Sequence, residues 1–496
     1  MKTKLVLCIF LIKTIMGFSQ WNQIGNIIVG DSPLDEFGLS VDINSEGTIV
    51  AIGSYATTPG SSEDTQGLVR VFENISGVWT QIGADIYGEH DDDFSIFPSL
   101  NSEGNILAIG AYGNDYNGVF AGYVRVFENI AGVWTQIGSD INGENPGDFA
   151  GHSVSLNANG NIVAIGSPGN FDNGTIPGHV SVFENIGGVW TQIGSNINGE
   201  SSGDRAGQSI SLNSNGDIVA IGSPLNDDNG NDSGHVRVFQ NIAGVWTQIG
   251  SNINGGVEGD WTGFSVSLNS NGNILAIGSP NVDDTVSVYE YIAGIWTQIG
   301  SFDNVENWGT GRSVSLNANG DILAIGSPYN YRTGQTYAGH VKVYKKIAGV
   351  WTQVNADIFM QNSFNLFGWS VSLNSDGDTL AVGAPYYSLA PNYYSTAGAA
   401  VIYNNTNVLN VTEDNLGQSI SLYPNPTNDF SFIKFGKFHE QIKMNIFDSQ
   451  GKLIKSYVYK NTDLIKIETT KWAAGIYYIN LSLLDKMTTV KLVLTN

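Results

Sequence analysis

One unit recurs seven times along this 496-residue chain, and the repetition limits the possible folds more than any other feature. A single copy, residues 206–250, reads AGQSISLNSNGDIVAIGSPLNDDNGNDSGHVRVFQNIAGVWTQIG. Its elements SVSLN, AIGSP and VRVFEN each occur seven times with small changes, at a repeat spacing of 50 to 58 residues. Such a period is typical of repeat architectures, in which each unit buries its apolar face against its neighbours.

Each copy is expected to form four strands. SVSLN alternates polar and apolar residues, NIVAIG is a short apolar run, and VRVFEN and VWTQIG are rich in β-branched and aromatic residues. Asn-x-Asn-Gly and Asn-Ile-Ala-Gly separate these runs as turns. A four-stranded unit at this spacing predicts an all-β chain with a seven-bladed β-propeller of four-stranded blades over residues 20–408. An open stacked solenoid is the alternative.

The seventh copy is incomplete at its end. No VWTQIG follows its third strand, residues 399–403, whereas the related phrase WNQIG stands alone at residues 21–25. We therefore predict that residues 21–25 supply the fourth strand of blade seven by pairing with residues 399–403. This pairing closes the ring and removes two open sheet edges that would otherwise promote aggregation.

The first 19 residues have the layout of a secretory signal peptide. Lys2 and Lys4 precede a short apolar run, and Gly17-Phe18-Ser19 is typical of a cleavage site. The run is too short to cross a bilayer, so no transmembrane segment is expected. The only cysteine, Cys8, lies inside the run, so the mature chain has no disulfide. The net charge of −24 repels phosphate backbones, so nucleic acid is not an expected partner.

The repeat units resemble FG-GAP repeats, which build the propeller of integrin α subunits and of many bacterial surface proteins. The resemblance rests on Phe37-Gly38 with Ser40-Val41, on Phe367-Gly368 with Ser370-Val371, and on AVGAP at residues 381–385. In the integrin type, the turn after the first strand is often an Asp-rich calcium loop. Here these turns are short and poor in carboxylates, which disfavours the six to eight oxygen ligands that calcium takes. No cofactor is therefore expected, and the best metal candidates are Asn374, Asp376 and Asp378.

Residues 417–496 follow a linker at 409–416 and have a different composition, with ten Lys and eight acids over 409–496. They resemble the C-terminal sorting domain of type IX secretion cargo in Bacteroidetes. The residues that carry this resemblance are Pro424, Asn425, Pro426, Gly475, Tyr477 and Lys491. The resemblance implies a small Ig-like β-sandwich that the type IX translocon recognises, and a secreted or outer-membrane cell-surface location. An adhesive Ig-like module is the alternative.

The candidate ligand site lies on the propeller face whose loops vary. The residue before Ser-Val of the first strand changes from copy to copy, and in a closed ring these residues would lie near the channel mouth: Leu39, Ile96, His152, Gln208, Phe264, Arg312 and Trp369. Late blades add aromatic loops. We hypothesise a patch for a glycan or a protein ligand, because flat aromatic rings suit sugars and anchor partners. Its predicted members are Phe264, Arg312, Trp369, Trp261, Trp308, Tyr329, Tyr386 and Tyr387. Packing between blades is the alternative role.

Signs of an enzyme are few in the sequence. His179, His235 and His340 share one repeat position, which favours a structural role, and no nucleophile elbow, His-rich metal spacing or phosphate-binding loop is present. The expected function is non-enzymatic binding or adhesion. A polysaccharide-degrading enzyme and a structural surface component without a small ligand are the alternatives. A Tyr/His/Arg cluster in the channel would favour the enzyme.

Overall fold

The structure, a computed structural model, describes residues 21–495 with internal gaps. The gaps are residues 33–34, 56–65, 90–95, 170–176, 304–308, 331–335, 361–363, 389–395, 406–419, 424, 426, 449–451, 471 and 484–485. The predicted signal peptide and the linker at 409–416 lie outside the described residues. The chain divides into two compact units, residues 1–408 and 409–496, which are described separately. Within the described residues, no helix has the length and apolar character that crossing a membrane requires.

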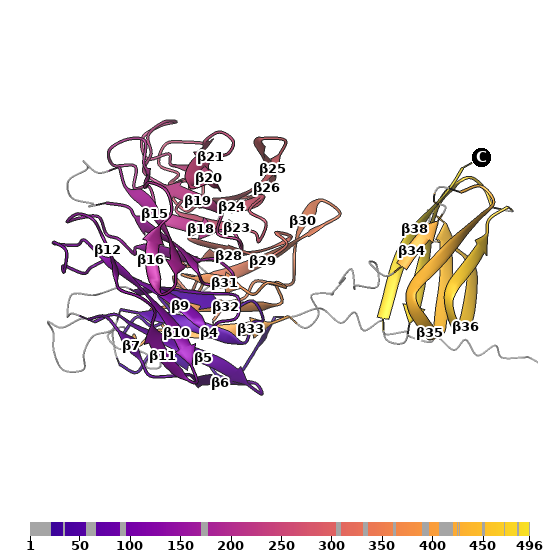
Figure 1. Cartoon of the computed structure of the whole chain (residues 1–496), viewed down its shortest axis with the longest axis horizontal. Helices are drawn as coiled ribbons and strands as arrows, with labels where there is room; N and C mark the ends of the chain where they lie inside the picture. Colours follow the sequence, from indigo (N-terminus) through magenta and orange to yellow (C-terminus); the bar gives the residue numbers. More distant parts are fainter. Residues whose placement is uncertain are drawn as a thin grey trace, which may run out of the picture. The chain divides into compact units, whose positions relative to one another are not determined.

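The first unit contains seven antiparallel sheets with four repeat strands each. In six sheets these strands are consecutive in the chain, and in the seventh the N-terminal strand completes the sheet (Figure 1). The first strands are β3 (Ser40–Ile43), β8 (Ile96–Leu100), β13 (Ser153–Leu156), β18 (Ser209–Leu212), β23 (Ser265–Leu268), β27 (Ser313–Leu316) and β31 (Val371–Leu373). The second strands are β4 (Ile49–Ser54), β9 (Ile106–Ala111), β14 (Ile162–Ser167), β19 (Ile218–Ser223), β24 (Ile274–Ser279), β28 (Ile322–Ser327) and β32 (Thr379–Ala384).

The outer half of each blade contains the two longer repeat phrases. The third strands are β5 (Leu68–Ile75), β10 (Tyr123–Ile130), β15 (His179–Ile186), β20 (His235–Ile242), β25 (Thr285–Ile292), β29 (His340–Ile347) and β33 (Ala399–Asn404). The fourth strands are β6 (Val78–Gln81), β11 (Val133–Gln136), β16 (Val189–Gln192), β21 (Val245–Gln248), β26 (Ile295–Asp303), β30 (Val350–Gln353) and, for blade seven, β1 (Asn22–Gln23). The predicted seven-bladed propeller is confirmed.

A short extra strand pairs with the third strand in five blades, which the repeat pattern did not predict. These strands are β7 (Ile86–Tyr87), β12 (Ile141–Asn142), β17 (Ile197–Asn198), β22 (Ile253–Asn254) and β2 (Ile28–Val29). The Gly of VWTQIG has positive φ in the first four of these blades, as at Gly83, and interrupts the fourth strand. In blade five, β26 instead continues through a register shift opposite Val288/Tyr289.

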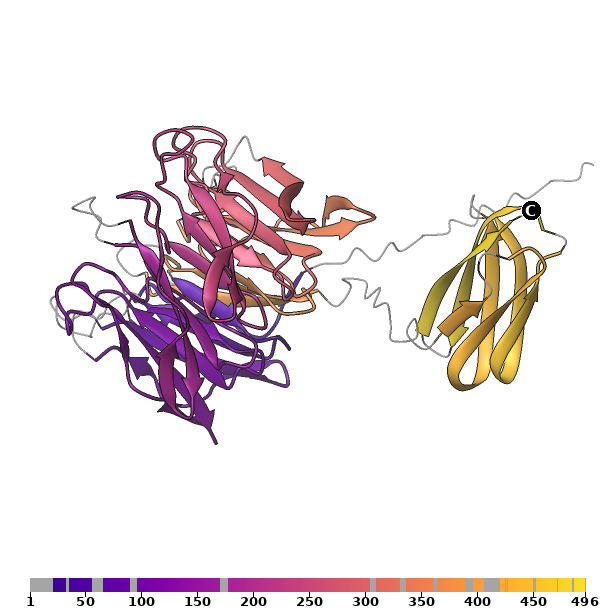
Figure 2. The ribbon, with the colours of Figure 1, turned by 45° about the horizontal axis from the view of Figure 1, so that its top comes forward.

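The ring closes as predicted. Asn22 pairs with Asn404 and Gln23 with Tyr403, and β2 extends the pairing inward at Ile28 and Ala400. Trp21 is buried in the apolar core of blade seven. In both views the last blade, coloured orange, therefore lies beside the indigo strands of blade one (Figure 2). The sheet edges at the two ends of the repeat array are thus paired within the ring.

The repeat tryptophan joins neighbouring blades. The indole N–H of Trp134 donates to the carbonyl oxygen of Ile82 in the preceding blade at 3.0 Å, and the equivalent bond recurs at Trp190, Trp246 and Trp296. At the closure, Trp79 of blade one donates to Ile24, also at 3.0 Å. The N-terminal segment therefore completes blade seven and also provides the acceptor for blade one.

The repeated glycines allow the blades to approach closely. A Cβ built on Gly166 of the AIGS element would lie 2.2 Å from the carbonyl oxygen of Gly207, which belongs to the first-strand motif of the next blade. Across the ring closure, a Cβ on Gly383 would lie 2.0 Å from the carbonyl oxygen of Gly38. Any larger residue would push adjacent blades apart, which explains why these two positions are Gly in the repeat.

The second unit is a five-stranded antiparallel assembly. Its strands are β34 (Ile420–Tyr423), β35 (Phe430–Asp448), β36 (Leu453–Glu468), β37 (Gly475–Leu483) and β38 (Lys486–Leu494), in the order β34-β35-β37-β38 with β36 also on β35. The long β35–β36 pair changes register between Lys434 and His439. Residues from both halves of β35, including Ile433 and Met444, belong to one buried core. This unit therefore has an apolar core of its own, as the sequence predicted for a small β-domain.

Candidate binding site at the central channel

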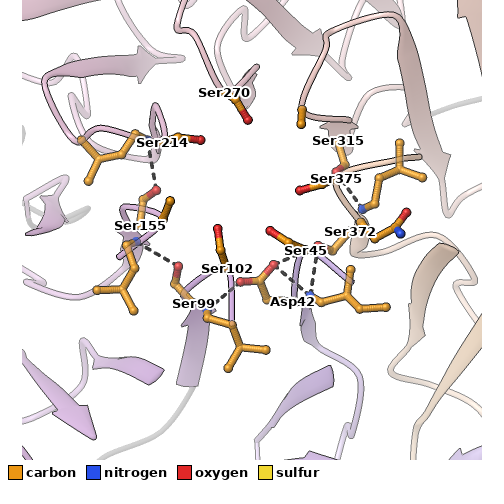
Figure 3. A pocket seen from close by; sticks show the side chains of 18 of the residues that line it. Asp42, Ser45, Ser99, Ser102, Ser155, Ser214, Ser270, Ser315, Ser372 and Ser375 are labelled. Atoms are coloured by element: carbon orange, nitrogen blue, oxygen red, sulfur yellow. Dashed lines mark hydrogen bonds between the residues drawn. The ribbon is translucent and has the colours of Figure 1, made fainter. Parts of the chain in front are cut away.

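The first strands of neighbouring blades contact one another all around the ring. At the end of these strands beside the Asn-Gly turns, they enclose an open cavity of about 340 Å³ (Figure 3). Ser, Asn and Leu positions from all seven blades line the cavity, and hydroxyl groups surround its open centre. Every blade therefore contributes a repeat position to the wall of the channel at this end.

Side-chain hydrogen bonds connect all seven blades at the channel wall. In each case a backbone N–H of one blade donates to the second serine position of the preceding blade. The pairs are Leu156 to Ser99, Leu212 to Ser155, Leu268 to Ser211, Leu316 to Ser267, Leu373 to Ser315, Ile43 to Ser372, and Leu100 to Asp42, at 2.7–3.2 Å. This serine ring satisfies a backbone donor at every joint, because the first strand has no further strand on its channel side.

A second ring runs through the turns. The backbone N–H of Ser45 donates to the carbonyl oxygen of Ser102, and the same bond continues blade by blade until Ser375 donates to Ser45, at 3.0–3.1 Å throughout. Because this ring passes across the join between blades seven and one without a break, the closure there is equivalent to the other six joints. The two rings hold the wall of the cavity in a fixed arrangement.

Asp42 is the one acidic member of the serine ring. Its carboxylate accepts from Ser372 Oγ at 2.8 Å, from the Ile43 N–H at 3.0 Å and from the Leu100 N–H at 2.7 Å. Burial raises the pKa of Asp42 to about 6, and the three hydrogen bonds oppose that rise only in part. Asp42 is the only non-serine residue at its repeat position, but it was not among the predicted site residues.

The stability of the Asp42→Ser variant relative to wild type is expected to increase as pH rises. The folded pKa of about 6 exceeds the ordinary value of 3.8, so the Asp42 contribution is fully present below about pH 4 and is lost as pH rises through 6. A shift of about two units corresponds to up to about 3 kcal/mol, less any screening by water in the cavity. Urea unfolding of wild type and Asp42→Ser between about pH 4 and about pH 8 measures this difference. Asp376→Ser, at an exposed acid in a turn, serves as the control; equal pH slopes for Asp42→Ser and wild type would contradict the assignment.

The Asn-Gly turns use their own polar side chains. Asn374 Oδ1 accepts from the N–H groups of Asp378 and Thr379 at 3.0 and 2.9 Å, and its amide donates to Asp378 Oδ1 at 2.9 Å. The other six blades repeat the buried Asn and its bond to the residue five positions later. Of the three metal candidates, only Asp376 is exposed. The arrangement is that of an Asx-type turn, in which Asn374 and Asp378 already have hydrogen-bond partners.

At the other end of the first strands, Arg312 lies between two aromatic rings. Its guanidinium carbon is 3.8 Å from the ring centre of Trp369 and 4.7 Å from that of Phe264. These three residues come from blades six, seven and five, so the predicted ring position does bring them together. Arg312 Nε is buried without a hydrogen-bond partner, and no ion pair within the described residues includes Arg312. Burial lowers the pKa of Arg312 to about 10, so the side chain is still charged at neutral pH.

Two further predicted residues extend this group. The Trp261 ring stacks on Phe264 with centroids 6.2 Å apart, and the Tyr329 ring meets Trp369 edge-on at 6.1 Å. We call Trp261, Phe264, Arg312, Tyr329 and Trp369 the Arg312 cluster. Tyr337 adjoins it through Tyr329, with centroids 6.1 Å apart, although the sequence analysis did not name it.

The other predicted patch residues do not belong to the Arg312 cluster. Tyr387 is only 9% exposed and packs in the apolar core of blade seven, so its assignment to a surface patch was wrong. Tyr386 is 38% exposed, and its hydroxyl is hydrogen-bonded to the Glu36 carboxyl across the join of blades seven and one. Trp308 lies outside the described residues. Asp284, in the loop before β25, is buried, and its carboxylate accepts the Gly309 N–H at 2.6 Å.

A second variable position at the mouth escaped the sequence analysis. Three residues before the ring position, the backbone has positive φ in every described blade: Glu36, Phe149, Arg205, Trp261, Gly309 and Leu366. The ring residue's N–H donates back to this residue, as from Phe264 to Trp261 at 3.0 Å. Left-handed backbone at a non-Gly residue costs about 1–2 kcal/mol, and strain of this kind clusters at functional sites. In five of these six blades, the variable residue stands between a buried Asp or Asn and a Gly two positions later, and this pattern is visible in the sequence.

His152 occupies the ring position of blade three. Its ring lies 5.3 Å from that of Tyr112 and 5.6 Å from that of Phe97, and Nε2 is 3.4 Å from the Gln208 side-chain nitrogen. Burial lowers the pKa of His152 to about 4, and the charges of Arg205 and Arg312 act in the same direction. Arg312 belongs to the blade three positions further round the ring.

Residues implicated in sorting lie in the second unit. Asn425 Oδ1 accepts the Val493 N–H at 2.8 Å, and Tyr477 is buried with its hydroxyl donating to the Ala473 carbonyl at 3.0 Å. Gly475 pairs with Leu494, and Lys491 with Tyr478, along β37 and β38. Pro424 and Pro426 lie outside the described residues. The named residues therefore hold the last strand against the rest of the unit.

The solved structures that are similar to this chain have low sequence identity with it. A β-propeller domain of Cps50 (Swd1) from Myceliophteria thermophila is 12% identical over 77% of this chain and 99% of its own, with a TM-score of 0.49. A chain of hydrazine synthase from Kuenenia stuttgartiensis is 13% identical over 76% of this chain and 97% of its own, with a TM-score of 0.47. Similarity at this level carries no information on activity. No curated protein matches the chain.

The tail is recognisable as a family member. Residues 421–495 match the family model described as the secretion system C-terminal sorting domain. The match covers almost the whole segment that the sequence analysis assigned to sorting by the type IX system. The chain is therefore an exported propeller protein that carries a type IX sorting domain, with a secreted or cell-surface location.

Proposed function

We propose that the propeller is a non-enzymatic, FG-GAP-type binding module which holds an extracellular glycan bearing carboxylate groups at the Arg312 cluster. The observation that carries the proposal is the Arg312 guanidinium, which lies between the rings of Trp369 and Phe264 and has no carboxylate partner among the described ion pairs. Export by the sorting domain would deliver such a module to the place where extracellular polymers occur.

The chemistry of the cluster suits an acidic sugar. A guanidinium recognises carboxylates through charge-assisted hydrogen bonds, and two flanking rings hold it in place by cation–π contacts. Trp261, Tyr329 and Trp369 are half-buried, so part of each ring is accessible. Flat aromatic surfaces of this kind contribute contact area at little entropic cost. A neutral sugar would leave the Arg312 charge unpaired, so the cluster favours an anionic ligand.

Removing the charge is expected to weaken binding about 10- to 100-fold, because a hydrogen bond to a charged group contributes about 1.5–3 kcal/mol. The measurement is a screen of glycans and matrix proteins, followed by titration of the best ligand with wild type, Arg312→Gln and Trp369→Ala. Tyr116→Ala is the matched control, because Tyr116 is a 77% exposed aromatic residue in a loop of blade two. Unchanged affinity in both cluster variants, with their melting temperatures preserved, would reject the proposal. A protein ligand in place of a glycan would correct its ligand class.

One observation favours an enzyme as the second candidate. His152 and Tyr112 are in ring contact at the same mouth, within reach of the charges of Arg205 and Arg312. A Tyr, a neutral His and Arg side chains are the groups that proton abstraction beside a carboxylate requires, as in cleavage of uronic acid polymers. Incubation with such polymers, followed by ultraviolet detection of unsaturated products, tests this. Cleavage that is lost in His152→Ala would replace the binding proposal by the enzyme.

A further inference from the structure

A buried histidine and two carboxylates meet in blade four, away from the Arg312 cluster. His235 begins β20, Asp228 lies in the loop between β19 and β20, and Glu200 follows β17. One nitrogen of the imidazole and one oxygen of each carboxylate lie within 4.8 Å of one another. The sequence analysis assigned His235 a structural role from its repeat position, and it did not group these residues because 27 and six residues separate them along the chain.

Among the residues that the structure describes, His235 has no hydrogen-bond partner, although it is completely buried. Its exposed fraction is 0%, and neither ring nitrogen forms a hydrogen bond. Nδ1 lies 3.8 Å from Glu200 Oε2 and 3.8 Å from Asp228 Oδ2, and both distances are too long for hydrogen bonds. A buried polar atom without a partner is unfavourable by about 1–3 kcal/mol. A ligand between the three groups would remove that penalty at Nδ1.

The equivalent histidine of blade six has a partner. His340 also begins a third strand, but its Nδ1 is in contact with the Asn330 side-chain amide. The corresponding amide of blade four, Asn226, is buried without a hydrogen-bond partner for its nitrogen. The two histidines therefore differ in their neighbours: carboxylates lie near Nδ1 of His235, whereas an amide contacts Nδ1 of His340. A packing role alone explains His340, but not the arrangement around His235.

The spacing of the three residues occurs twice in the sequence. Glu200, Asp228 and His235 are matched one blade earlier by Glu144, Asp172 and His179, with the same separations along the chain. Asp172 lies outside the described residues. The repetition of all three residue types at these distances is a second, independent reason to treat them as a set.

The charges around His235 suit a divalent cation. Glu200, Asp204 and Asp228 act on the ring with negative charge, and Arg237 acts on it with positive charge. Arg237 is occupied on the other oxygen of Glu200, with Nη1 3.7 Å from Oε1, and donates to the Asn198 carbonyl at 2.7 Å. Three carboxylates and one guanidinium leave two net negative charges, which a divalent ion would balance.

We propose that His235 Nδ1, Glu200 and Asp228 form a binding site for a divalent transition-metal ion of the Zn²⁺ type. One imidazole and two carboxylates are a donor set that Zn²⁺ uses with three protein ligands and an open fourth position. Tetrahedral coordination places such donor atoms about 3.3–3.6 Å apart. The distances of 3.8 Å need to close by a few tenths of an ångström, and the Glu200 and Asp228 side chains are 37% and 46% exposed. Glu200 Oε2 also accepts a hydrogen bond from the Asn252 amide at 2.9 Å, so its approach to a metal ion would have to keep or replace that bond. Calcium does not fit, because it prefers six to eight oxygen ligands.

The test is a Zn²⁺ titration of the full chain in competition with a chromogenic chelator. All variants carry His179→Ala, so that the second copy of the spacing does not mask a loss. This background is expected to bind one equivalent of Zn²⁺. Adding His235→Ala, or Glu200→Gln together with Asp228→Asn, is expected to weaken binding at least tenfold. Adding His340→Ala is expected to leave it unchanged, and excess Ca²⁺ is expected not to compete.

Each result has a fixed meaning. The proposal is overturned if the background binds no Zn²⁺, or if the carboxylate double variant binds as tightly as the background. His235 is buried, so its alanine variant could fail to fold; the double variant changes only partly exposed side chains and decides the matter in that case. Displacement of Zn²⁺ by Ca²⁺ would also overturn the assignment of the metal class.

Discussion

Deletion of residues 21–25 is expected to abolish cooperative folding of the propeller. The deletion removes β1 from blade seven, takes Trp21 out of a buried core, and removes the carbonyl that accepts the Trp79 indole N–H. Loss of a buried Trp alone costs about 3–5 kcal/mol, and an unpaired β33 edge and a lost hydrogen bond add to this. Because whole domains are stable by only about 5–15 kcal/mol, the open ring is expected to unfold or aggregate.

A matched pair of tryptophans separates ring closure from simple core packing. Trp21 and Trp351 occupy the same repeat position, and neither indole N–H has a hydrogen-bond partner within the described part of the chain. Trp351 follows directly in sequence on the third strand of its own blade. Trp21 is far in sequence from the other strands of blade seven and is held there only by non-covalent contacts. Trp351→Ala is therefore expected to lower the free energy of unfolding locally, and Trp21→Ala to release the N-terminal strand as well. Hydrogen exchange should show early loss of protection in blades one and seven for Trp21→Ala alone.

A peptide of residues 21–30, added to the deletion variant, is expected to restore folding, because β1 and β2 bind through backbone pairing and one buried ring. If the deletion variant stays monomeric and its amides are protected from hydrogen exchange as in wild type, β1 is not needed for ring closure. If Trp21→Ala and Trp351→Ala lose the same free energy of unfolding and show the same pattern of hydrogen exchange, core packing and not ring closure determines stability.

The repeat pattern was sufficient to predict the ring, because each repeated phrase has one local role. SVSLN alternates and becomes the channel strand, and the apolar AIGSP strand lies inside the sheet. The seven copies fix the number of blades, and the missing phrase after residue 403 places the N-terminal strand in blade seven. These features depend on periodicity and strand pairing, which a sequence records directly.

The sequence was less informative where contacts cross from blade to blade. That Arg312 would lie between Phe264 and Trp369 followed from their shared register, but the burial of Tyr387 and Asp284 depends on loop paths that the repeat does not specify. Asp42 could have been recognised as the single acid among six serines at one position. The set around His235 draws on a loop, a strand and the end of the preceding repeat, so only the three-dimensional arrangement brings it together.

Removal of residues 417–496 is expected to stop export completely and leave the propeller in the periplasm. Residues 421–495 match the sorting domain family, and they form a unit with its own core. The propeller is expected to remain folded, since its blades and closing strand lie within residues 21–404. Cell fractionation in a host with the type IX system, with protease resistance of the trapped propeller as the folding readout, measures both effects. Normal export of the truncated chain would refute a sorting role for the tail.

Two point variants test whether recognition needs the folded tail. Ile446 on β35 is 0% exposed, so Ile446→Asp places a charge without a partner in the core and is expected to unfold the unit. Val458 on β36 is 56% exposed, so Val458→Asp makes the same chemical change on the surface. We expect export to be lost in Ile446→Asp and kept in Val458→Asp. Export of both variants would mean that the translocon recognises an unfolded stretch of the tail. Recognition of the folded tail would instead depend on the core around Ile446.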